Sequence, residues 1–224
     1  MLNDKRVRII IGHYGSGKTE FAVNYIMKLA EEVKRPAIAD LDIVNVYFRS
    51  REKAKMLTDK GIDVISSNTG HGANLDLPAI SARVLAPLQD DSYDVVLDVG
   101  GDSVGARVLV RYQDLLKHIG YDMFCVVNAY RTETQDVEGV IKHIKDIEES
   151  SGLKVTGLIN NSHLLRETTV EEVMHGQKLV ESVSEELNIP IKYISTLEGV
   201  AKQLPSNLSG EIFPIEMYMR EDWM

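Results

Sequence analysis

The chain contains a single cysteine, Cys125, so no disulfide can form within it. Cys125 sits in the apolar run 123–127. This context indicates a small buried hydrophobic residue in a reducing compartment. A disulfide is also unnecessary, since a chain of this size can bury on the order of 70% of its unfolded surface in a hydrophobic core. We therefore expect a cytoplasmic protein.

Basic residues are in short supply. The 34 aspartates and glutamates outnumber the 25 lysines and arginines, and the formal net charge is -9. Such a surface repels a nucleic-acid backbone or an anionic membrane unless a local patch reverses the sign. We therefore expect neither nucleic acid nor membrane as a partner.

Long apolar segments are missing as well. No uncharged apolar stretch approaches the ~18 residues that cross a bilayer, and residues 1–6 lack the apolar region of a secretion signal. No internal repeat, low-complexity tract or proline-rich linker divides the sequence. These absences predict one domain over residues 1–224 that is neither exported nor inserted into a membrane.

Short apolar runs instead alternate with segments of helical periodicity. The pattern predicts strands at 7–11, 37–40, 63–66, 95–98, 122–127, 156–160 and 191–194, and helices at 21–33, 48–60, 78–88, 104–119, 137–147, 169–187 and 197–204. Repeated strand–helix units produce a mostly parallel sheet with helices on both faces. Ligands of such α/β sheets bind at the carboxyl ends of the strands.

Residues 12–19, GHYGSGKT, match the phosphate-binding loop pattern G-x-x-x-x-G-K-[ST] between a predicted strand and a predicted helix. The glycines let backbone N–H groups turn inward around phosphate oxygens, and the helix N-terminus adds partial positive charge. Lys18 is expected to reach the β- and γ-phosphates, and Thr19 to hold Mg²⁺. This context disfavours an ordinary glycine-rich turn. The predicted nucleotide-binding residues here are Gly12, Gly15, Ser16, Gly17, Lys18, Thr19 and Glu20.

Carboxylates end two of the other predicted strands. Asp98 closes the run 95–98 before two glycines, as a second Mg²⁺-facing element requires. Gly101 is a candidate for backbone approach to a γ-phosphate, or simply part of a turn. Asp40 and Asp42 close another strand and face one side of it, where one of them can orient an attacking water. A helix-capping role for either residue is the alternative.

The GHYGSGKT loop, DLD at 40–42 and VVLDVGG at 95–101 together resemble the ParA/MinD-like and CobQ/CobB-related P-loop NTPases. The resemblance implies a three-layer α/β sandwich with an about seven-stranded sheet. It also implies that Asp40 orients water, that Asp98 is the Walker B residue and that Asn160 contacts adenine. Asn161 is an alternative to Asn160, and a simple turn role is another. His13 stands where the ParA/MinD branch has a signature lysine, so a cross-dimer mechanism is not implied, and a homodimer rests on the resemblance alone.

These features predict a Mg²⁺-dependent ATP-binding protein that hydrolyses ATP as a nucleotide-driven switch, with Lys18 and Asp40 as catalytic residues and Thr19 and Asp98 as metal ligands. The absence of an NKxD motif disfavours GTP. One alternative is an ATP-dependent ligase or kinase whose metabolite is held by the polar loop 67–76. Another is a nucleotide-gated adaptor without turnover. The partner, protein or metabolite, has no motif of its own in the sequence.

Overall fold

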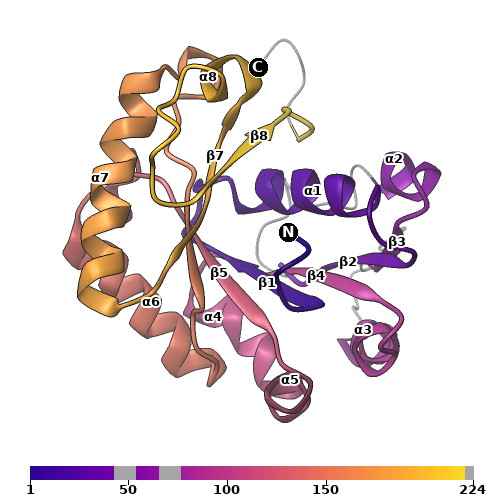
Figure 1. Ribbon diagram of the computed structural model, residues 1–224. Coiled ribbons are helices and arrows are strands. Elements are labelled where there is room, and N and C mark those ends of the chain that lie inside the picture. The colour runs from indigo at the N-terminus through magenta and orange to yellow at the C-terminus, as the bar shows by residue number, and fades with distance from the viewer. Residues whose placement is uncertain (43–53, 66–76, 220–224) are drawn as a thin grey trace.

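The computed structural model describes residues 1–42, 54–65 and 77–219 (Figure 1). Eight strands form one sheet in the order β3-β2-β4-β1-β5-β6-β7-β8. Every neighbouring pair in it is parallel. The strands are β1 (Val7–Ile11), β2 (Pro36–Asp40), β3 (Asp63–Ile65), β4 (Asp94–Asp98), β5 (Asp122–Val127), β6 (Gly157–Asn160), β7 (Ile191–Leu197) and β8 (Glu211–Ile215). All their carboxyl ends therefore meet at one edge of the sheet.

Helices connect these strands, as parallel neighbours require. They are α1 (Lys18–Leu29), α2 (Ala54–Asp59), α3 (Leu77–Gln89), α4 (Ser103–Ala106), α5 (Gln113–Ile119), α6 (Val137–Ser151), α7 (Val170–Leu187) and α8 (Glu198–Ala201), with 3-10 turns η2 (Arg107–Tyr112), η3 (Thr132–Thr134) and η4 (Leu165–Glu167). In Figure 1, α1 and α2 lie on one face of the sheet, and α3 to α6 lie on the other.

The strands β1, β2, β4, β5 and β6 are buried on both faces, which explains their continuous apolar runs. Ile9 and Ile11 of β1 join a core that includes residues of α3, α5, α6 and α7, while Ile10 between them joins the core built around α1. Cys125 of β5 is 1% exposed, and burial raises the pKa of its thiol to about 12. The expected α/β sandwich is confirmed, and the cysteine is the buried hydrophobic residue that its context indicated.

Two predictions of local structure were wrong in detail. The sheet has an eighth strand, β8, which the sequence pattern did not indicate because Pro214 interrupts it. Proline is tolerated there because, within the described part of the chain, β8 lies at the edge of the sheet and pairs with β7 on one side. The predicted helix 104–119 is divided into α4, η2 and α5. The predicted loop 67–76 and the first part of the predicted helix 48–60 lie outside the described residues.

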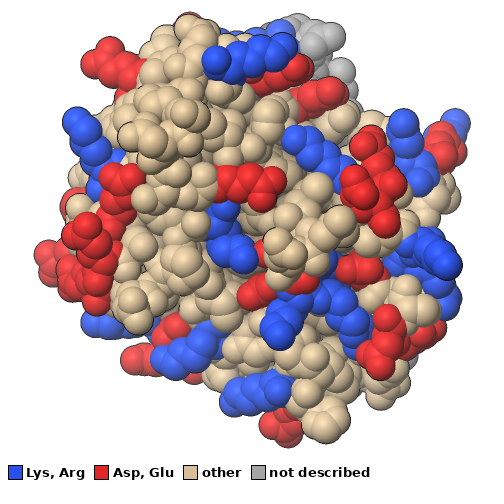
Figure 2. Space-filling model, viewed as in Figure 1, with Lys and Arg blue, Asp and Glu red and all other residues tan. Residues whose placement is uncertain are grey.

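Figure 2 shows basic and acidic side chains interspersed over one face of the molecule, with acidic side chains along the edge that α7 forms. The helix α7 has the sequence VEEVMHGQKLVESVSEEL, in which five glutamates accompany one lysine. Over the described part of the chain, no helix combines the length and the apolar character needed to span a membrane.

Candidate nucleotide-binding site

The glycine-rich loop 12–17 leaves the carboxyl end of β1 and leads directly into α1. Gly17 caps α1 in the left-handed region, with φ of 84°. A Cβ atom on Gly17 would lie 2.4 Å from the side-chain nitrogen of Asn161, so both the backbone angle and the space require glycine. The loop thereby presents the N-terminus of a twelve-residue helix, which favours an anion.

Lys18, the first residue of α1, is held by a carboxylate. Its Nζ lies 3.2 Å from Oδ2 of Asp42, and the two side chains are 6% and 0% exposed. The same Nζ lies 5.6 Å from the centroid of the Tyr14 ring. Asp42 of the DLD motif thus forms an ion pair with the loop lysine. The sequence had not assigned Asp42 a specific partner.

Asp98 ends β4 next to this pair and is fully buried. Among the described residues, neither of its carboxylate oxygens has a hydrogen-bond partner within the protein. Burial raises its pKa to about 6, while the charge of Lys18 opposes that rise. Two buried carboxylate oxygens without partners, beside a threonine hydroxyl, form a donor set that suits a hard divalent cation such as Mg²⁺.

Asp40 lies beside Asp98 in the sheet, since the two residues are register partners in β2 and β4. Asp40 is 7% exposed, and its Oδ1 accepts a hydrogen bond from the backbone N–H of Asp42 at 3.2 Å. Asp40 therefore shapes the turn that carries Asp42 toward Lys18. Its predicted role in orienting water is compatible with this position at the carboxyl edge of the sheet.

His13, at the position of the ParA/MinD signature lysine, contacts its own chain. Its ring centroid lies 5.5 Å from that of His143 in α6, and its Nδ1 lies 3.7 Å from a carboxylate oxygen of Glu133. His143 is mostly buried, and burial lowers its pKa to about 4. His13 thus packs the phosphate loop against α6.

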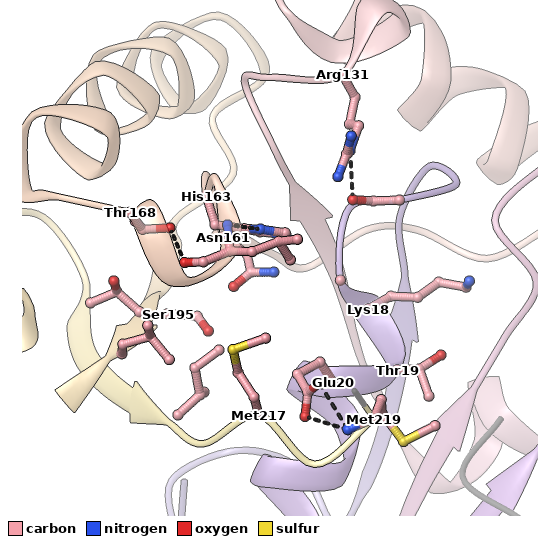
Figure 3. Close-up of a pocket in the computed structure, with 16 residues that line it drawn as sticks. Lys18, Thr19, Glu20, Arg131, Asn161, His163, Thr168, Ser195, Met217 and Met219 are labelled. Atoms are coloured by element: carbon pink, nitrogen blue, oxygen red, sulfur yellow. Dashed lines mark hydrogen bonds between the residues drawn. The ribbon is translucent and has the colours of Figure 1, made fainter. Parts of the chain in front are cut away.

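A pocket opens beside the loop, toward the carboxyl ends of β6 and β7. Its lining consists of Gly15, Gly17, Lys18, Thr19, Glu20, Arg131, Asn161, His163, Leu165, Thr168, Ser195, Thr196, Leu197, Ile215, Met217 and Met219. In Figure 3, Asn161, His163 and Thr168 lie on one side of the pocket, Met217 and Met219 on another, and Lys18 and Thr19 at its phosphate-loop end. A cavity with a cationic end and a partly apolar body matches the division of a nucleotide into phosphates and base.

Asn160, predicted to contact adenine, points away from this pocket. Its side-chain nitrogen donates to the backbone oxygen of Val173 at 3.0 Å and to Gln177 at 3.1 Å, both in α7. The neighbouring Asn161 lines the pocket instead, and donates to the backbone oxygen of Ser16 at 2.7 Å. Successive residues at a strand end face opposite sides. The asparagine at the pocket is therefore the one that the sequence analysis held as the alternative.

Glu20 and Arg131 both line the pocket through contacts with backbone groups. Arg131 Nε donates to the backbone oxygen of Gly15 at 2.8 Å. Glu20 accepts hydrogen bonds from the backbone N–H groups of Tyr218 and Met219. Arg131, Ser195 and the two methionines were absent from the predicted site, because they come from three separate segments of the chain that carry no motif.

Comparison with known proteins agrees with this architecture. No family model matches the chain, and no curated protein matches it. FtsY from Thermotoga maritima superposes with a TM-score of 0.58 at 23% identity, covering 86% of this chain and 62% of that one. Chloroplast FtsY from Physcomitrella patens gives a TM-score of 0.60 at 17% identity, covering 88% of this chain and 60% of that one. The signal recognition particle receptor FtsY from Elizabethkingia anophelis in complex with GDP gives a TM-score of 0.55 at 16% identity, covering 86% of this chain and 58% of that one.

The chain therefore has the fold of a P-loop NTPase, and it spans about three fifths of the length of these structures. At such identities the similarity establishes the fold alone. The narrower resemblance to the ParA/MinD and CobQ/CobB proteins stays a prediction, since the structures named above are FtsY proteins.

Proposed function

We propose that the chain is a cytoplasmic, Mg²⁺-dependent ATP-binding protein, with one nucleotide-binding domain over residues 1–224, that hydrolyses ATP and acts as a nucleotide-driven switch. The observation that carries this proposal is the buried group of Lys18, Asp42 and Asp98 at the N-terminus of α1, beneath a loop that fits the phosphate-binding pattern. A buried cation and two buried carboxylates are costly to maintain without a ligand that uses them.

Each residue has a distinct role in this proposal. The loop amides and Lys18 hold the phosphates, and Lys18 offsets charge on the phosphoryl group that leaves. Thr19 and Asp98 hold the cation, which when bound neutralises phosphate charge. Asp40 orients the attacking water.

The body of the pocket favours adenine over guanine. Guanine presents two adjacent N–H donors that a carboxylate accepts best. Among the described lining residues the only carboxylate is that of Glu20, which accepts backbone hydrogen bonds from Tyr218 and Met219. Adenine needs a mixed donor and acceptor set, which the amide side chain of Asn161 and the hydroxyl of Ser195 supply.

The segment after β4 supports a switch that acts on a protein partner. A Cβ atom on Gly101 would lie 2.9 Å from the backbone oxygen of Gly12, so this segment packs directly on the phosphate loop. Beyond it, Val104 and Val110 are 54% and 52% exposed. A ligand that moves the loop can therefore alter an apolar surface. A second copy of the chain is one candidate for the partner.

The test is Mg²⁺-dependent phosphate release from ATP and from GTP, with Lys18→Ala as the blank and calorimetry to measure binding. We expect release from ATP that the variant abolishes, together with loss of tight ATP binding. Unchanged affinity in Lys18→Ala would refute the phosphate-loop assignment. Preferential turnover of GTP would refute the adenine assignment, and tight ATP binding without any phosphate release would replace the hydrolase with an adaptor or with a metabolite-dependent enzyme.

A further inference from the structure

One face of α1 holds the C-terminal part of the chain through main-chain contacts. Glu20, Asn24 and Lys28 are spaced by four residues, so they share a face of the helix. The carboxylate of Glu20 accepts from the N–H of Tyr218 at 2.6 Å, Asn24 exchanges two hydrogen bonds of 2.8 Å with the backbone of Glu216, and Lys28 Nζ donates to the backbone oxygen of Pro214 at 2.5 Å. We name residues 214–219 the C-terminal strap.

The start of the strap is anchored in the core. Phe213, the residue before it, is 2% exposed, and its ring lies within 5.2 Å of Phe21 and 5.4 Å of Tyr193. The Nζ of Lys28 lies 4.1 Å from the centroid of the same ring, and burial lowers the pKa of Lys28. Aromatic packing and a cation over the ring thus fix where the strap leaves β8.

The strap directs alternate side chains into the pocket. Ile215, Met217 and Met219 all line it, whereas Glu216 between them is exposed. Figure 3 shows Met217 and Met219 beside Glu20, across the pocket from His163 and Thr168. Leu165 contributes to the far side with a positive φ of 58°, a backbone conformation that is strained for leucine and that concentrates at binding sites.

Ser195 of β7 adds a polar atom to this largely apolar enclosure. It is 1% exposed, lines the pocket, and its Oγ has no hydrogen-bond partner among the described residues. It follows Tyr193 by two positions and so shares the sheet face that packs on α1. A buried hydroxyl without a partner indicates a ligand that supplies one.

We propose that the C-terminal strap is the wall that recognises the base of the nucleotide, with Met217 and Met219 packing on the ring and Ser195 contacting its polar edge. Glu20 is a positioning residue, because it sets the strap without touching the base. This inference rests on the proposed function and assigns the nucleoside part of the same ligand.

The experiment separates the base from the phosphates by measuring the binding of ATP and of inorganic tripolyphosphate, each with Mg²⁺, by calorimetry. The variants are Met217→Ala, Ser195→Ala, Glu20→Ala and Glu20→Gln. Glu32→Gln, which changes an exposed glutamate just after α1, is the control. We expect Met217→Ala and Glu20→Ala each to weaken ATP roughly tenfold, through lost apolar contact with the ring. Tripolyphosphate affinity stays unchanged in Met217→Ala and is not weakened in Glu20→Ala, because that substitution removes a negative charge from the first turn of α1. Ser195→Ala weakens ATP alone, and Glu20→Gln, which keeps an acceptor oxygen, recovers part of the loss.

The comparison distinguishes two kinds of failure. If wild-type protein binds neither ATP nor tripolyphosphate, the proposed function fails, and the inference fails with it. If wild type binds both ligands but Met217→Ala and Glu20→Ala leave ATP affinity unchanged, the strap is not the base wall. Equal loss of both ligands also overturns the inference, because it indicates general damage to the site rather than loss of base contact.

Discussion

The carboxylate of Asp98 lowers the stability of the folded protein, and the proposed function uses the same carboxylate to bind Mg²⁺. Its carboxyl is fully buried, and burial raises its pKa to about 6, so the charged form opposes folding at neutral pH. The difference from the ordinary value of 3.8 corresponds to on the order of 3 kcal/mol at pH 8. Asp98→Asn should therefore raise the thermal midpoint at pH 8, by on the order of 5 °C, and weaken Mg²⁺-dependent ATP binding at least tenfold.

Differential scanning calorimetry with and without Mg-ATP checks both halves of this prediction. Asp63→Asn, which changes an exposed carboxylate in β3, is the matched control and should alter neither quantity. A lower midpoint for Asp98→Asn would show that the charged carboxylate stabilises the fold, contrary to the direction of its pKa shift.

Asp42 pairs with Lys18 at the position that the proposed function assigns to phosphate, so it acts as an internal counter-ion. Asp42→Asn leaves the buried lysine without its 3.2 Å ionic partner, and we expect the unliganded protein to lose about 3 kcal/mol of stability. Anion affinity should rise, because tripolyphosphate no longer competes with a carboxylate for Lys18. The rise in thermal midpoint on adding tripolyphosphate should thus be larger in the variant than in wild type. An equal or smaller rise would exclude the counter-ion role.

At the scale of elements, the turn after β4 and the phosphate loop fit together through glycine. A Cβ atom at Gly101 would approach the backbone oxygen of Gly12 to 2.9 Å and the backbone nitrogen of Tyr14 to 3.0 Å. Gly101→Ala should push the two elements apart, lowering stability by about 1–3 kcal/mol and reducing tripolyphosphate affinity. Gly199→Ala in α8 is the control, since nothing lies within 4 Å of its added Cβ. Chemical denaturation and calorimetry measure both effects. Tripolyphosphate binding retained in Gly101→Ala would contradict the proposed packing.

The predicted strands match the structure where the local sequence pattern alone determines the strand. Buried parallel strands have uninterrupted apolar runs, so 7–11 and 122–127 were predicted with the bounds observed for β1 and β5. β8 was missed because Pro214 and the exposed Glu211 break its pattern, and only pairing with β7 makes it a strand. Asn160 and Asn161 could not be told apart, because one residue of register decides which of the two faces the pocket.

For the whole molecule, the sequence indicated the glycine-rich loop at one end of the pocket, but at the other end it indicated only Asn161, and that as an alternative to Asn160. The loop 12–19 is contiguous, so its motif is visible in the sequence. The rest of the pocket combines Arg131, Asn161, Ser195 and Met217, which come from four separate parts of the chain. No local spacing joins them. They meet because parallel strands place all their carboxyl ends at one edge of the sheet.

The stability of the whole chain at acid pH should contain two opposing contributions, one from Asp98 in the candidate site and one from His143 in α6. The pKa of Asp98 is raised to about 6, so its protonation favours the folded state as the pH falls from 7 to 5. The pKa of His143 is lowered to about 4, first by burial and then by the charge of His13, with Asp146 and Asp102 opposing. Folding keeps His143 neutral, so stability is lost as the pH falls from about 6.5 toward 4. Each contribution is on the order of 1–2 kcal/mol between pH 7 and 5.

Two variants separate these contributions. Asp98→Asn removes the stabilisation that protonation of Asp98 provides, so this variant should lose more stability than wild type as the pH falls from 7 to 5. His143→Leu removes the destabilising contribution of His143, so this variant should lose less stability than wild type. Leucine is a suitable replacement because the buried Nε2 of His143 has no hydrogen-bond partner within the described residues. Urea unfolding at both pH values measures the two differences. Identical pH dependence in wild type and both variants would show that neither group differs in protonation between the folded and unfolded states at these pH values, and that acid sensitivity arises elsewhere in the chain.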